Sequence, residues 1–122
     1  MCPAAPRRGP LAALSDAVLA EPVLTEAVRL AREGADGLTL VGPTPVRPHL
    51  VKGLVDAGRL VLAVTATVRE AEDLTEEIKA VVGSDTVALY PAWETLPHER
   101  LSPRSDTVGN RLAVLRRLKH PG

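Results

Sequence analysis

Residues 89–106 read LYPAWETLPHERLSPRSD, a long segment that separates a short apolar run from a final amphipathic pattern. It contains the only tryptophan of the chain, Trp93, and the only tyrosine, Tyr90. Connections between strands and helices usually have about 2–6 residues, so a segment of this length indicates a function or the remains of one. The fold is predicted from the apolar runs and amphipathic patterns on either side of this segment.

Three short apolar runs lie before this segment or at its start, at residues 38–41, 60–64 and 86–90. Each run is continuous rather than alternating, which is typical of strands that are buried on both faces of a parallel sheet. Amphipathic patterns at 46–55 and 68–81 separate the runs and predict crossover helices. The predicted fold class is therefore α/β, a partial three-layer parallel sheet with flanking helices.

Local signals predict where the helices begin and end. Thr67 and Glu70 form a capping box at the start of the second crossover helix, and Gly83 follows its end. Pro22 divides the first ordered stretch into two short helices, because proline is tolerated in a first helical turn but not in an interior. Gly34 ends the second of them. Ser105 or Asp106 is expected to cap the last helix.

Composition sets the broad class of the protein. The 122 residues suffice for one domain or part of one, and residues 1–10, with three prolines, predict a disordered lead-in to an ordered part at 11–122. Fifteen basic residues balance fifteen acidic ones, so net charge favours neither a nucleic-acid nor a membrane partner. The single cysteine, Cys2, excludes an internal disulfide, and no apolar run approaches the length of a membrane helix. We expect a cytoplasmic protein.

Charge is unevenly distributed despite the zero net charge. Residues 68–85 carry six acidic side chains, whereas residues 100–119 carry six basic side chains and one acidic one, Asp106. The basic segment either contacts phosphates, as arginine-rich helix faces do, or is a solvated face that pairs with the acidic helix or another domain. No aromatic residues are interleaved with these bases, which favours the second interpretation.

The turn after residues 38–41 is where a parallel α/β protein would bind a phosphate. A phosphate loop reads G-x-x-x-x-G-K-[ST], but an alignment on Gly42 places Arg47, Pro48 and His49 at its last three positions. Three prolines in this stretch also remove backbone N–H donors. The sequence therefore predicts a degenerate loop without a bound cofactor.

Other catalytic or metal-binding arrangements are not predicted. Glu94 and Glu99 are interpreted as solvated residues of the long segment rather than an acid–base pair. His49, His98 and His120 have no acidic or cysteine partners at metal-ligand spacing. No catalytic residue and no metal site are therefore assigned.

The residues WETLPHERLSPRSD at 93–106, followed by Arg111, Leu112 and Leu115, resemble the N-terminal module of the bacterial transcription-repair coupling factor family, Mfd. Residues 60–74 also fit, and the resemblance covers about residues 11–120. It implies a fold similar to the first domain of the excision-repair protein UvrB, a RecA-like domain. In UvrB the stretch that matches Gly42 to His49 is a working phosphate loop, whereas in this family the module is a degenerate copy that does not hydrolyse ATP.

The resemblance also implies what the whole protein does. Proteins of this family are ATP-driven translocases on double-stranded DNA that displace stalled RNA polymerase and recruit UvrA, with ATP and magnesium in a motor further along the chain. None of the polymerase-binding, UvrA-binding or motor parts is expected within residues 1–122. The chain is expected to be an N-terminal piece of a longer protein.

The role expected for this piece is that of a noncatalytic module that packs with later domains and helps control access to the UvrA-binding surface. Trp93, Leu96 and Pro97 are the expected packing anchors, although a lone tryptophan can also serve as a stacking platform. Interdomain contacts are expected from three bases: Arg100, Arg104 and Arg111. Two alternatives stay open, a small phosphate-binding α/β protein and a free-standing DNA-binding module that uses Arg116 and Arg117.

Overall fold

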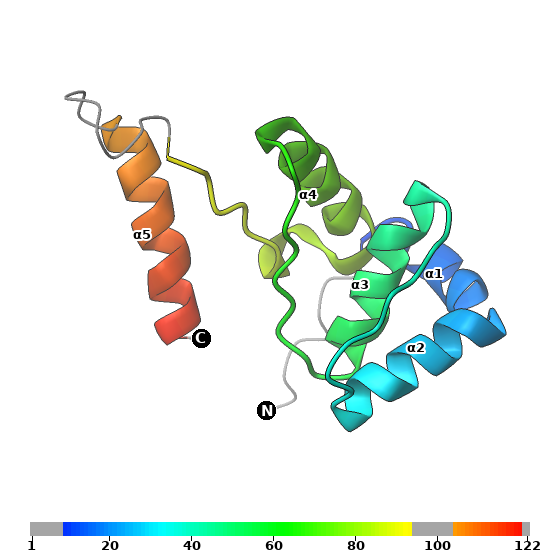
Figure 1. The fold of residues 1–122 in the computed structure, drawn as a ribbon. Helices are drawn as coiled ribbons and strands as arrows, with labels where there is room; N and C mark the ends of the chain where they lie inside the picture. The colour runs from blue at the N-terminus through cyan, green and yellow to red at the C-terminus, as the bar shows by residue number, and fades with distance from the viewer. Residues whose placement is uncertain (1–8, 94–103, 121–122) are drawn as a thin grey trace, which may run out of the picture.

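The computed structural model describes residues 9–93 and 104–120 (Figure 1). Most of the expected disordered lead-in, residues 1–8, lies outside this part of the chain, as do Leu96, Pro97 and Arg100. The described residues form five α-helices and two short 3-10 helices: α1 (Ala12–Leu19), α2 (Pro22–Glu33), η1 (Thr44–Val46), α3 (Arg47–Asp56), α4 (Val68–Val82), η2 (Ser84–Thr86) and α5 (Ser105–Lys119).

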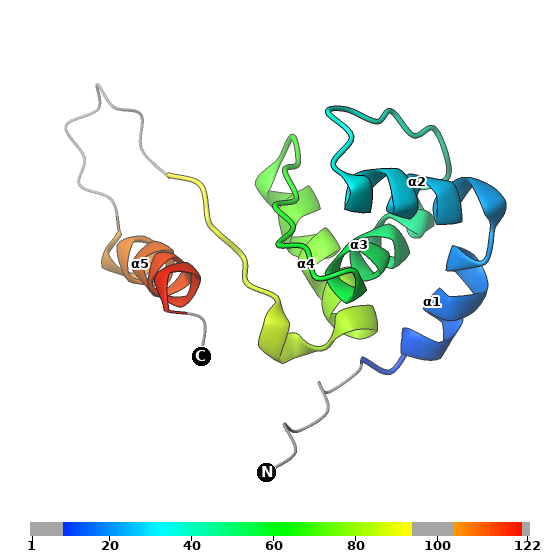
Figure 2. The ribbon, with the colours of Figure 1, turned by 90° about the horizontal axis from the view of Figure 1, so that it is seen from below.

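The predicted parallel sheet is wrong, because no strand forms among the described residues. A sheet requires neighbouring extended segments that exchange backbone hydrogen bonds about 4.8 Å apart. The three apolar runs exchange none in the described part of the chain. Figures 1 and 2 show residues 60–66 beside α3 and α4, whereas residues 87–93 lead away toward α5. The apolar runs therefore remain unpaired connections between helices.

The predicted helix boundaries are largely confirmed. Pro22 begins α2, and Gly34 follows its end with a left-handed φ of 89°. The Thr67 hydroxyl accepts a hydrogen bond from the backbone N–H of Glu70 at 3.2 Å, as the capping box requires. The predicted cap of α5 is wrong, since the helix already begins at Ser105 and no side chain caps it.

Helix α3 lies at the centre of the helical part and contacts α1, α2 and α4 (Figure 2). Gly53, in the middle of α3, permits this close packing. A Cβ atom at Gly53 would lie 3.0 Å from Val28 Cγ2 and 3.2 Å from Leu19 Cδ1. The surrounding core is small and aliphatic; its buried hydrophobic side chains are Ala12, Leu24, Ala27, Ile78 and Val81.

Helix α5 stands apart from the other helices and is reached through the extended residues 87–93 (Figure 2). Its attachment is polar: the Arg117 guanidinium donates to the backbone oxygen of Asp85. The leucines of its amphipathic pattern, Leu112, Leu115 and Leu118, are all exposed. The apolar face of α5 is thus not covered by any described part of the chain.

We expect Gly53→Val to destabilise the helical part by about 1–3 kcal/mol, because added methyl groups in a packed core force neighbouring side chains and backbone apart. The matched control is Gly109→Val in α5, where a Cβ atom would meet nothing within 4 Å. The control should change the free energy of unfolding by no more than about 0.5 kcal/mol. Urea titration followed by far-ultraviolet circular dichroism measures both. Equal effects would contradict the close packing at Gly53.

Candidate functional site

The degenerate phosphate-loop stretch ends inside the protein core. Gly42 is exposed, and Arg47 begins α3 with an exposed side chain. Pro48 and His49, the next two residues, are buried. His49 Nδ1 lies 2.7 Å from the hydroxyl oxygen of Ser15, and the two side chains share a buried hydrogen bond between α3 and α1.

This arrangement commits the first turn of α3 to packing. His49 stands at the position where a phosphate loop has its Ser or Thr. The residue is 92% buried, and its ring shares a hydrogen bond with the fully buried Ser15. One turn later the buried Lys52 pairs with Asp56 of the same helix. His49 and Lys52 are therefore used within the fold, whereas Arg47, at the start of α3, is exposed.

Arg111 joins α5 to the described start of the long segment by aromatic and hydrogen-bond contacts. Its Cζ atom lies 4.0 Å from the centre of the Tyr90 ring and 4.2 Å from that of the Trp93 ring. Its Nη1 donates to the backbone oxygen of Pro91 at 2.5 Å. Cation–π contacts contribute about 0.5–1 kcal/mol each at exposed sites, so this cluster fixes α5 to residues 90–93.

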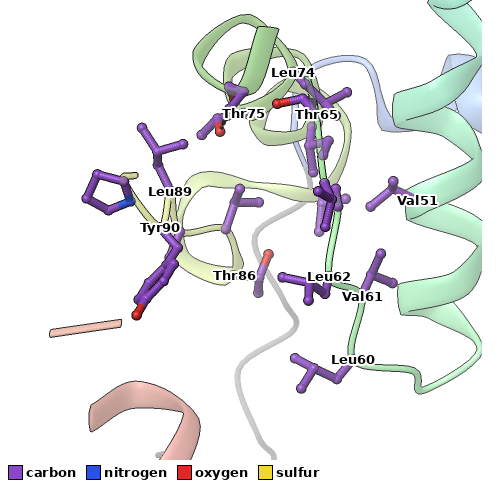
Figure 3. A pocket seen from close by; sticks show the side chains of 18 of the residues that line it. Val51, Leu60, Val61, Leu62, Thr65, Leu74, Thr75, Thr86, Leu89 and Tyr90 are labelled. Atoms are coloured by element: carbon purple, nitrogen blue, oxygen red, sulfur yellow. Dashed lines mark hydrogen bonds between the residues drawn. The ribbon is translucent and has the colours of Figure 1, made fainter. Parts of the chain in front are cut away.

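A cleft of about 650 Å³ lies between residues 59–68 and 86–92, over α3 and α4. We call it the aliphatic cleft, since most of its lining is Val, Leu, Ile and Ala. Figure 3 shows Val61 turned toward Val51 of α3, whereas Leu60 and Leu62 extend to the other side of the segment. Leu74 and Leu89 contribute from α4 and from the segment before Tyr90.

The structure describes three of the six residues predicted to form an interface. Trp93 and Arg111 lie together, while Arg104 lies directly before α5. Leu96, Pro97 and Arg100 lie outside the described residues. Sequence reasoning missed the roles of Ser15 and Tyr90, whose partners are distant in sequence. The only local signal was the polarity of Ser15 on a helix whose other residues, apart from Asp16, are apolar.

Metal-binding clusters and membrane-spanning helices are both absent among the described residues. These residues contain no group of three or more His, Cys, Asp or Glu side chains placed to hold a metal ion. Among them, no helix has both the length and the apolar character needed to cross a membrane. A resolved pKa shift lies away from the cleft, on α2, where the hydrogen bond from Arg29 lowers the pKa of the Glu26 carboxyl.

The basic segment is partly engaged within the chain. Arg111 stacks on two aromatic rings, and Arg117 donates to a backbone oxygen. The ion pairs found in the described part of the chain lie within α2, α3 and α4, so α5 forms none with the acidic helix. Arg117, one of the two arginines on which the DNA-binding alternative rests, thus donates to the backbone oxygen of Asp85.

Comparison with known proteins identifies the family. The chain is 50% identical over 112 residues, 92% of its length, to proteins named transcription-repair-coupling factor from Mycobacterium bovis and Mycobacterium tuberculosis. It belongs to the transcription-repair-coupling factor family. A protein of the same name from Haemophilus influenzae is 28% identical over 91 residues, or 64% of the chain. No family model matches the sequence.

The resemblance to coupling factors seen in the sequence is therefore confirmed. The chain spans 9% of the length of the two mycobacterial coupling factors and 8% of that from Haemophilus influenzae. It corresponds to a short segment of a much longer protein, in agreement with the predicted N-terminal piece.

Arg111→Ala is expected to shift the fluorescence emission of Trp93 to longer wavelength, because the indole loses the guanidinium that covers one of its faces. Trp93 is the only tryptophan, so the emission reports on this site alone. The control is Arg116→Ala, which removes an exposed charge from the same helix. Identical spectra for Arg111→Ala and the unchanged chain would show that the stacked arrangement is not populated in solution.

Proposed function

We propose that this chain is a noncatalytic segment of a transcription-repair coupling factor, and that it packs with the remainder of that protein. One observation carries the proposal: half of the aligned residues are identical over 92% of the chain, yet the match covers only 9% of each mycobacterial relative. A chain that matches its relatives along nearly all of its own length, but over only 9% of theirs, corresponds to one part of a multidomain protein.

The activity then belongs to the longer polypeptide. By resemblance to its family, that polypeptide is a cytoplasmic ATP-driven translocase on double-stranded DNA, which displaces stalled RNA polymerase and recruits UvrA for excision repair. ATP and magnesium act in its motor, outside these 122 residues. The names of the relatives support the link between repair and transcription; the rest is part of this proposal.

The noncatalytic assignment is supported by the start of α3. Pro43, Pro45 and Pro48 supply no N–H groups to a phosphate. His49 replaces the hydroxyl residue that would contact magnesium and is bonded to Ser15 instead. A nucleotide at this position would have to break the packing of α1 on α3.

The interface that we propose with later domains centres on the long segment. Trp93 is 52% exposed although it stacks on Arg111, so one part of its ring is available to another domain. The same role is proposed for the other predicted residues: Leu96, Pro97, Arg100 and Arg104. Through these contacts the segment would help control access to the UvrA-binding surface.

A denaturing immunoblot of the source cells, with an antibody against residues 105–119, tests the assignment to a longer protein. We expect a band about ten times the 12.9 kDa of this chain, because the chain covers 9% of its relatives. The purified 122-residue chain serves as the size control. A band only at the size of that control would overturn the proposal.

Isothermal titration of the chain with Mg-ATP tests the noncatalytic assignment. No saturable heat is expected, because three prolines remove N–H donors from this stretch and His49 replaces the magnesium ligand. If saturable heat is observed, the matched variant Arg47→Ala shows whether it arises at this stretch, since Arg47 is its exposed cation. Heat that disappears in Arg47→Ala would show a working phosphate site and contradict the assignment.

A further inference from the structure

We draw no further inference here: the strongest candidate, the surface patch that the exposed Leu112, Leu115 and Leu118 form on α5, is an unpartnered apolar face, and nothing in the described part of the chain shows what covers it.

Discussion

The close approach of α1 and α2 to α3 is the constraint on which the helical part depends. Glycine at position 53 leaves a space that a Cβ atom would share with Val28 and Leu19 at 3.0–3.2 Å. The same helix carries His49, bonded to Ser15, and the buried Lys52. Close aliphatic packing and buried polar pairs thus lie within five residues. At the start of this helix His49 and Lys52 are committed to partners within the fold, whereas Arg47 keeps an exposed side chain.

What the sequence could predict was set by local chemistry. The left-handed glycine after α2, the proline that begins it and the threonine that caps α4 each act within a turn of their own position, and all three are found where expected. The cap predicted for α5 failed, although it too was local. The N-cap position of α5 is occupied by Arg104, whose side chain has no oxygen that could accept a hydrogen bond from the first turn.

The errors of greater consequence concern partners distant in sequence. Residues 60–64 read as a buried strand because they are continuously aliphatic, but strand pairing depends on what lies beside them and cannot be deduced from the run alone. Ser15 and His49 are 34 residues apart, and Arg111 is 20 residues from Pro91. Sequence spacing gave no reason to join them. The candidate cleft was missed for the same reason, since its walls come from segments that neighbour one another only after folding.

The position of α5 follows from a competition between two uses of its basic side chains. Exposed ion pairs with the acidic α4 would contribute about 0–1 kcal/mol and would be screened by salt. Stacking of Arg111 between Tyr90 and Trp93, together with hydrogen bonds to backbone oxygens, requires no second charged helix and satisfies the guanidinium groups along the extended segment. The arginines therefore hold α5 on that segment, and the aliphatic cleft stays open beside it. Because polar contacts and not apolar packing set the position of α5, Leu60, Leu62 and Val64 of the longest aliphatic run stay exposed in the described part of the chain.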